Sequence, residues 1–493
     1  MVRARHHRAG CGGRHHGARH HRSAARGLDP KPCVERWPGC RSSRPCSGHT
    51  TADAGIIAAV ANNGKGGRGV APDAKILDIQ APGAAQQPAP RIINSSDGMQ
   101  SPGFVPFAMD AFDADFDRAS SAAMPLMVKA AGNNFLHGAG LSFDECAALT
   151  ERSGVGCMPA GADVVSAMPT ALSVAAVNAA GKRASYSSTG SVLWISGLGG
   201  ELGHQREYVL NGGQLPPEAT RFPDAYFGPA ITTSDVMGCA KGVNRYGASS
   251  NALDFGPRSP IDSSCNYTAI ANGTSSAAPT VSGVIALMLQ VNSNLSWRDI
   301  KYILATTARK IDRDQGDVVW DGVVVDSGWV TNTSNRSFSN QLGFGLVDAT
   351  AAVAAARRFV SLPALTRTQW HRYGGTPVAI PYRSDKSGFA AIEVSDDVKI
   401  ESVQLRINTT HRNPRNLRIA VISPSGTRSI VMPALTGTKL LGEGFEIGLT
   451  ATNAFLDEPS KGTWKLQVID VLNPSSASSL ISWEVLVIGH RSV

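Results

Sequence analysis

One short turn followed by a long apolar run constrains this chain more than any other stretch. Residues 272–279 read Asn-Gly-Thr-Ser-Ser-Ala-Ala-Pro, and apolar residues then recur at three- and four-residue steps as far as Leu289. That spacing predicts a buried helix, and Pro279 falls in its first turn, where a missing N–H costs nothing. Ser275 therefore lies at a helix N-terminus, whose partial positive charge and free N–H groups suit a nucleophile that generates an oxyanion. Alternatively, Ser275 caps an ordinary core helix.

On both sides of this turn, apolar strands alternate with helical segments. The alternation predicts a largely parallel sheet with helices on both faces, which is a doubly wound α/β fold. Ser296 and Asp299 have the spacing of a capping box and predict a further helix, and an Ala-rich helix ends near residues 357–358. The expected strands are residues 75–79, 91–94, 124–131, 171–177 and 192–196, and the other expected helices are residues 54–61 and 110–123.

The sequence pattern changes beyond residue 362. Short alternating strands separated by turns such as residues 423–426 predict an all-β sandwich. The expected strands there are residues 390–394, 402–407, 417–422, 464–468 and 482–487. We therefore divide the chain into a basic head (residues 1–47), an α/β domain (48–358), a linker (359–374) and a β-sandwich domain (375–493).

Positive charge is concentrated in the head. Residues 1–48 hold eleven Lys and Arg against two acidic residues, so the remaining chain carries −1 of the net charge of +8. A near-neutral body argues against nucleic-acid binding, and the head offers Trp37 as its only aromatic residue. The head lacks a periodic apolar pattern and the apolar core of a secretory signal, so we expect it to be disordered or a mis-framed reading of the coding DNA. No run approaches the roughly 20 apolar residues of a membrane span.

The cysteines of the body form two sequence-local pairs. Cys146 and Cys157 are one pair, and Cys239 and Cys265 are the other. Two disulfides would favour an exported protein, whereas four free thiols are the alternative.

Together these motifs resemble the subtilisin-like serine endopeptidases (peptidase S8), in particular the kexin-like branch with a C-terminal P domain. Residues 273–279 match the pattern Gly-Thr-Ser-x-Ala-x-Pro, and residues 130–133 read Ala-Ala-Gly-Asn. Residues 94–98 match the substrate-pairing pattern Asn-x-Ser-x-Gly, and residues 417–427 and 459–470 resemble the P domain. The resemblance spans about residues 48–490 and implies a subtilisin-like sheet followed by a jelly-roll-like β-sandwich.

The resemblance implies a role for each motif. Ser275 would form the acyl-enzyme, His49 would be the general base, and Asn133 would donate to the oxyanion. Ser96 and Gly98 would pair with the substrate. Asp163 would lie in the pocket for the residue before the scissile bond and select Arg or Lys; a solvated loop Asp is the alternative. Residues 61–67 resemble a structural calcium loop, whose ligands would be the Asn63 side chain and the carbonyl oxygens of Ala61, Lys65 and Gly67.

The chain departs from the family pattern around His49. Residues 49–55 read His-Thr-Thr-Ala-Asp-Ala-Gly, so Thr50 and Asp53 replace a Gly and an apolar residue of the family's His motif. The family carries its triad Asp on a strand upstream of the His, and we predict no such strand here; the only upstream Asp, Asp29, precedes a Pro. Two functions remain open: an exported, monomeric endopeptidase acting on proteins or peptides, or a catalytically impaired homologue that binds partners through its P domain.

Overall fold

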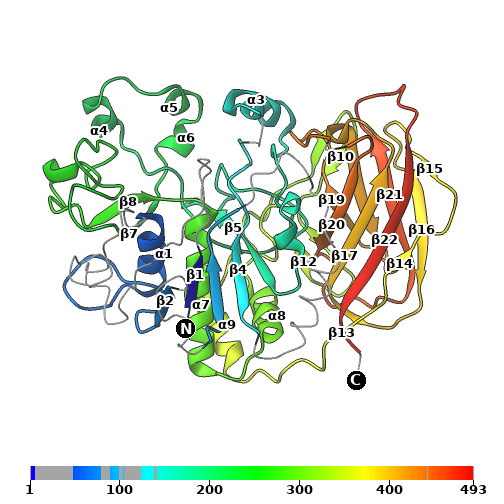
Figure 1. The fold of residues 1–493 in the computed structure, drawn as a ribbon, viewed down its shortest axis with the longest axis horizontal. Coiled ribbons are helices and arrows are strands. Elements are labelled where there is room, and N and C mark those ends of the chain that lie inside the picture. Colours follow the sequence, from blue (N-terminus) through cyan, green and yellow to red (C-terminus); the bar gives the residue numbers. More distant parts are fainter. Residues whose placement is uncertain are drawn as a thin grey trace, which may run out of the picture.

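The computed structural model describes residues 2–5, 48–78, 89–98, 104, 124–137, 141–440 and 442–491. In these residues an α/β body and a β-sandwich lie side by side (Figure 1). The expected helix at residues 110–123 and most of the basic head lie outside the described residues.

The body is built on a parallel sheet, as predicted. The described strands follow the order β2-β1-β3-β4-β5-β6, and each neighbouring pair is parallel. Every residue of β5 is buried, which is typical of a parallel strand covered on both faces. The bounds are β1 Val2–Arg5, β2 Ile76–Asp78, β3 Ile92–Ser95, β4 Leu126–Ala130, β5 Ala171–Val177 and β6 Leu193–Leu198.

Strand β1 differs from the sequence prediction, which placed no strand before His49. Val2 lies opposite Ile76 of β2 and Ile92 of β3, so β1 occupies an interior position of the sheet. A four-residue strand that reads Val-Arg-Ala-Arg is too short to show an apolar pattern in the sequence. Whether such a segment forms a strand depends on the strands beside it more than on the β propensity of its residues. These four residues include no carboxylate.

Helix α7 is the central helix of the body. It contacts β3, β4, β5 and β6 as well as α1 and α9, and it contains no charged residue. It is long and apolar enough to cross a membrane by length and composition alone, but 67% of that stretch is buried inside this protein. The helix bounds are α1 Gly48–Ala58, α3 Phe143–Ser153, α4 Arg206–Asn211, α5 Pro217–Arg221, α6 Pro223–Tyr226, α7 Thr274–Val291, α8 Trp297–Thr307 and α9 Ala349–Ala356.

The capping box and the two cysteine pairs predicted from the sequence of the body are confirmed. The Ser296 hydroxyl accepts from the Asp299 N–H, and the Asp299 carboxylate accepts from the Ser296 N–H, so the capping box starts α8. Both predicted disulfides form, Cys146–Cys157 and Cys239–Cys265. The second one closes the segment between two paired strands, β7 Ile231–Ser234 and β8 Tyr267–Ala271. The short strands before α9 are β9 Val318–Trp320, β10 Val323–Asp326, β11 Val330–Thr331 and β12 Ser337–Phe338.

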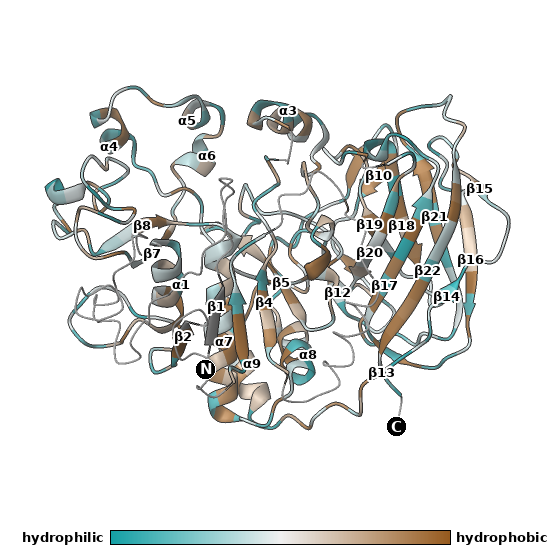
Figure 2. Cartoon of the chain, in the orientation of Figure 1, coloured by the Kyte–Doolittle hydropathy of each residue, from teal (hydrophilic) through white to brown (hydrophobic). Residues whose placement is uncertain are grey.

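The C-terminal unit is the predicted sandwich of two antiparallel sheets. One sheet has the order β13-β22-β17-β20, with β14 and β15 also on β22, and the other has the order β16-β21-β18-β19. Figure 2 shows β22 as a mostly hydrophobic strand, as are β4 and β5 of the body. The bounds are β13 Thr366–Arg367, β14 His371–Arg372, β15 Val378–Ala379, β16 Phe389–Val394, β17 Lys399–Thr409, β18 Leu417–Ile422, β19 Arg428–Met432, β20 Glu446–Thr452, β21 Gly462–Asp470 and β22 Ser479–His490.

The segment expected to be a linker, residues 359–374, contains β13 and β14, which both pair with β22. Strands of two residues are too short to show alternation in the sequence, so only the pairing reveals them. This part of the chain therefore adds to the sandwich sheet.

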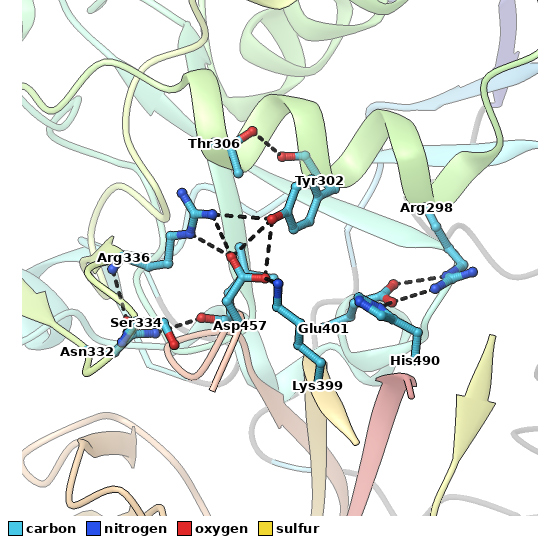
Figure 3. Close-up of polar contacts among 11 residues, drawn as sticks. Arg298, Tyr302, Thr306, Asn332, Ser334, Arg336, Lys399, Glu401, Asp457 and His490 are labelled. Carbon is cyan, nitrogen blue, oxygen red and sulfur yellow. Dashed lines mark hydrogen bonds and ion pairs between the residues drawn. The ribbon is translucent and has the colours of Figure 1, made fainter. Parts of the chain in front are cut away.

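A buried ion pair joins the sandwich to the body (Figure 3). Arg298 of α8 donates through Nε to Glu401 of β17 (2.9 Å), and His490 Nδ1 of β22 lies 2.8 Å from the same carboxylate. The side chains of Arg298 and Glu401 are only 7% and 11% exposed. Burial alone would raise the pKa of Glu401, but hydrogen bonds from His490 and Arg298 outweigh it and hold that pKa below its ordinary value.

A second cluster lies beside the first and centres on Asp457. Its carboxylate accepts from Arg336 Nε (2.7 Å) and from the Tyr302 hydroxyl (3.2 Å), both of the body. Lys399 of the sandwich lies 3.0 Å from its other oxygen. The two units are therefore connected by paired charges as well as by apolar packing.

Candidate functional site

Ser275 is the second residue of α7, as the sequence predicted. Its hydroxyl donates to the carbonyl oxygen of Ser96 (3.1 Å), just beyond the end of β3. The Ser96 hydroxyl donates in return to the carbonyl oxygen of Ser275 (3.0 Å). These reciprocal bonds join the start of α7 to the predicted substrate-pairing segment, although the two lie 179 residues apart in the chain.

The Asn133 side chain lies against the same turn. Its amide oxygen accepts from the Thr274 N–H (2.9 Å) and the Thr274 hydroxyl (2.8 Å), which leaves its nitrogen facing Gly273. A Cβ added to Gly273 would be 3.0 Å from Asn133 Nδ2 and 3.4 Å from the Ser275 nitrogen. Gly273 also has φ +96°, a conformation that other residues rarely adopt. A glycine thus leaves room beside two N–H donors, the arrangement that an oxyanion needs.

Tyr186 supports this turn and was not identified from the sequence. Its hydroxyl accepts from the Gly273 N–H (2.7 Å) and donates to the carbonyl oxygen of Gly200 (2.7 Å). Burial raises the pKa of this hydroxyl, so it stays neutral and can both donate and accept. A lone Tyr 87 residues upstream carries no motif, so only the fold could reveal this contact.

Asn94 anchors the predicted substrate-pairing segment. Asn94 is fully buried, donates to the Ser96 hydroxyl (2.9 Å) and accepts from the Ser282 hydroxyl of α7 (2.9 Å). Gly98, by contrast, is exposed, and an added Cβ there would meet nothing within 4 Å. The segment after β3 is therefore buried and hydrogen-bonded at Ser96 and exposed at Gly98.

His49 is the second residue of α1, and its side chain is 46% exposed. Its Nδ1 lies 3.7 Å from Oδ2 of Asp53, one turn further along the helix. Helices α1 and α7 pack against each other, and burial raises the pKa of Asp53 while the Ser96 side chain lowers it in part. Ser96 in turn contacts Ser275, and the Ser275 hydroxyl is turned toward the Ser96 carbonyl oxygen.

Asp163 is buried and already paired. Its carboxylate lies 2.9 Å from Lys129 Nζ and accepts from the Val165 N–H (3.1 Å). Lys129, on β4, also donates to the carbonyl oxygen of Asp97 in the substrate-pairing segment (2.6 Å). The alternative of a solvated loop Asp does not describe this residue, which is 8% exposed.

The predicted calcium loop follows α1 and is mostly exposed. Asn63 Oδ1 accepts from the Lys65 N–H (3.0 Å), which curls the loop on itself. Its amide and carbonyl oxygens are donors that suit calcium, although the proposed set includes no carboxylate. Within the described residues, no group of three or more His, Cys, Asp or Glu side chains could hold a metal ion.

Sequence families match both units of the chain. The subtilase family matches residues 38–345, and the proprotein convertase P-domain matches residues 400–487. The Aeromonas extracellular serine protease of Aeromonas sobria is 30% identical over 487 residues, which cover 89% of this chain and 73% of that protein. Proprotein convertase subtilisin/kexin type 6 of Rattus norvegicus is 34% identical over 229 residues, 44% of this chain and 23% of that protein.

The microbial serine proteinase of Aeromonas salmonicida is 32% identical over 335 residues, 63% of this chain and half of that protein. Among solved structures, the crystal structure of the serine protease of Aeromonas sobria superimposes with a TM-score of 0.77 at 27% identity. That superposition covers 91% of this chain and 82% of the other.

Proposed function

Because this chain belongs to the subtilase family of serine endopeptidases and carries a proprotein convertase P-domain, we propose that Ser275 is its nucleophile, His49 its general base and Asn133 its oxyanion donor. The observation that carries the proposal is the turn at Gly273. There the Asn133 amide nitrogen and the Ser275 nitrogen converge on the position that a Cβ on Gly273 would occupy, at 3.0 and 3.4 Å.

The proposed reaction begins when the Ser275 hydroxyl rotates from the Ser96 carbonyl toward His49. Ser275 Oγ attacks the peptide carbonyl carbon, and its proton passes to His49. The carbonyl electrons move onto oxygen, where the N–H of Ser275 and the amide of Asn133 stabilise the negative charge, each donor contributing a factor of about 100 to 1,000. His49 then gives its proton to the leaving amine, and a water molecule hydrolyses the acyl-enzyme by the reverse sequence.

A fluorophosphonate probe tests this assignment directly. The folded protein should form a covalent adduct, and peptide mapping should place it on Ser275. The variant Ser276→Ala is a matched control, because the neighbouring hydroxyl donates to the carbonyl oxygen of Asn272, just before α7, and should be dispensable. A folded protein that forms no adduct at any pH would instead support a binding role for the chain.

We also propose that the pair of Asp163 and Lys129 sets the preference for the residue before the scissile bond. A basic side chain entering this pocket would have to displace Lys129 from the carboxylate, so a peptide library should show no strong preference for Arg or Lys. Lys129→Met should raise kcat/KM for Arg relative to Leu at that position by about tenfold, because it frees a buried acceptor for charge-assisted bonding. A wild-type preference for Arg above a hundredfold would contradict this proposal.

We propose that Ca²⁺ binds the loop at residues 61–67, held by the Asn63 side chain and the carbonyl oxygens of Ala61, Lys65 and Gly67. A ligand that binds only the folded state at 100 times its Kd adds about 2.7 kcal/mol to the free energy of unfolding. Chelation should therefore lower the unfolding temperature of the wild type and not that of Asn63→Ala. Asn62→Gly is the control, because it keeps the positive φ of Asn62 and every proposed ligand.

We propose that the protein acts outside the cytoplasm, as a monomer, on protein or peptide substrates. Its two disulfides are typical of an oxidising compartment, and the relative from Aeromonas sobria is described as extracellular.

A further inference from the structure

Asp53 is a buried carboxylate in the middle of a helix that is otherwise built to pack. It is 4% exposed, and the other buried residues of α1 are Thr51, Ala52, Ala54, Gly55, Ile56, Ile57 and Ala58. Removing a carboxylate from water costs several kcal/mol unless a charge or hydrogen bonds compensate for it. Hydrophobic packing alone does not explain an Asp at this position.

The partners of Asp53 all belong to the proposed active site. His49 lies one turn earlier, and residues four apart share one face of a helix. Among the described residues, His49 is the only basic side chain recorded within 4 Å of the Asp53 carboxylate, with Nδ1 and Oδ2 separated by 3.7 Å. Ser96, whose side chain lowers the pKa of Asp53 in part against the larger effect of burial, contacts Ser275.

We propose that Asp53 is the positioning residue of His49, an inference that rests on the proposed function. Its carboxylate, 3.7 Å from Nδ1, favours the tautomer with the proton on Nδ1, so that Nε2 can take the proton of Ser275. When His49 takes the Ser275 proton, the imidazolium gains a partner of opposite charge and the Nδ1–Oδ2 separation closes to hydrogen-bonding length. Asp53, on the same helix as His49, thus takes the role that an Asp on an upstream strand has in the family: it orients the His and stabilises its protonated form.

The groups around this pair determine how it titrates. Helix α7, which packs against α1, carries no charged residue. Beyond β7, Asp235 lies next to the start of α1, since a Cβ on Gly48 would be 3.3 Å from its carboxylate. Burial raises the pKa of Asp53 well above its ordinary value, and the bond with Ser96 lowers it in part.

The active form requires a neutral His49 and an ionised Asp53, so the two groups titrate as a coupled pair. An ionised Asp53 stabilises the protonated imidazole and raises the pKa of His49. Removing that carboxylate should therefore move the acid limb of the kcat/KM profile to lower pH.

The test uses Asp53→Val and Asp53→Asn in the full chain, with Asp53→Glu as the conservative variant. We expect kcat to fall about a hundredfold in the first two, less than the roughly 10,000-fold loss for a triad Asp in hydrogen-bonding contact, with KM nearly unchanged. The acid limb and the pKa of His49 measured by NMR should move down together by about one unit. Asp53→Glu should restore part of kcat, and Asp53→Val should unfold no more easily than the wild type, because it removes a buried charge.

Asp326→Asn is the matched control. Asp326 is also a buried carboxylate, burial raises its pKa to about 6, and an Asn there still accepts from Asn340 and Ser327. This variant should leave the acid limb and the pKa of His49 where they are.

An unchanged pKa of His49 in both Asp53→Val and Asp53→Asn would overturn the proposal. The NMR titration needs no turnover, so it decides the role of Asp53 even if the probe fails to label Ser275. A fall in kcat that only matches a loss of folded protein would likewise reduce Asp53 to a structural residue.

Discussion

Replacing Ser275 with Ala should reduce kcat for a peptide substrate by about a million-fold, the loss expected when the nucleophile of a Ser–His pair is removed. KM should change little, because the variant leaves the proposed substrate-pairing segment after β3 in place. His49→Ala should cost nearly as much, and the double variant should be no slower than either single variant, since the two residues act as one unit. The measurement is the initial rate of peptide hydrolysis at high enzyme concentration.

Ser276→Ala again serves as the control and should keep a rate within a few-fold of the wild type. A Ser275→Ala variant that retains more than a thousandth of the wild-type kcat would show that the nucleophile lies elsewhere. Losses that multiply in the double variant would show that Ser275 and His49 act separately.

Replacing Arg298 with Ala should lower the free energy of unfolding by about 3–5 kcal/mol, because it leaves Glu401 charged, buried and without its main partner. Arg298 also donates to the carbonyl oxygen of Pro363 (2.7 Å). The variant therefore also loses the hydrogen bond that holds the segment leading into the sandwich. Urea unfolding followed by tryptophan fluorescence measures the change. We expect the single transition of the wild type to separate into two, one for each unit.

Arg372→Ala is the matched control for this prediction. Arg372 pairs with Glu484 (2.8 Å), but its side chain is 70% exposed, and exposed ion pairs contribute only about 0–1 kcal/mol. If both variants lost equally little stability, the buried pair would not be what holds the two units together.

The same pair predicts a pH dependence. The pKa of Glu401 is lower in the folded protein than in the unfolded chain, so its contribution is present above the unfolded value of about 4.3. That contribution is lost as the pH falls through the folded value, because the carboxylate must then be protonated. Glu401→Gln should therefore flatten the acid side of the stability curve.

Local patterns predicted much of the body. The apolar run around Pro279 and the capping box at Ser296 depend on neighbours within a few residues, and both helices form there. Helix α7 begins earlier than predicted, at Thr274, so Pro279 lies inside the helix and not in its first turn. The disulfides also join cysteines close in sequence. Strand β1 and the strands in residues 359–374 were missed because two to four residues carry no periodicity, and their pairing depends on partners far along the chain.

The residues of the candidate site also fall into two groups, those that short motifs identified and those that only the structure reveals. The resemblance identified Ser275, Asn133 and Ser96 because each belongs to a short motif, and the structure brings all three to the start of α7. Tyr186 and Lys129 lie in no motif, and their contacts span 87 and 32 residues. In the sequence, Asp53 stood out only because it departs from the family's His motif. Its proposed role depends on its distance from His49, which only the structure gives.

The position of β22 has a consequence for synthesis. This strand pairs with β13, β14, β15 and β17, and its His490 completes the cluster around Glu401. None of those pairings can form before residues 479–490 have left the ribosome, so this sheet of the sandwich closes after the whole body has been made. A ribosome that stops before residue 479 releases a chain without the strand on which four others assemble.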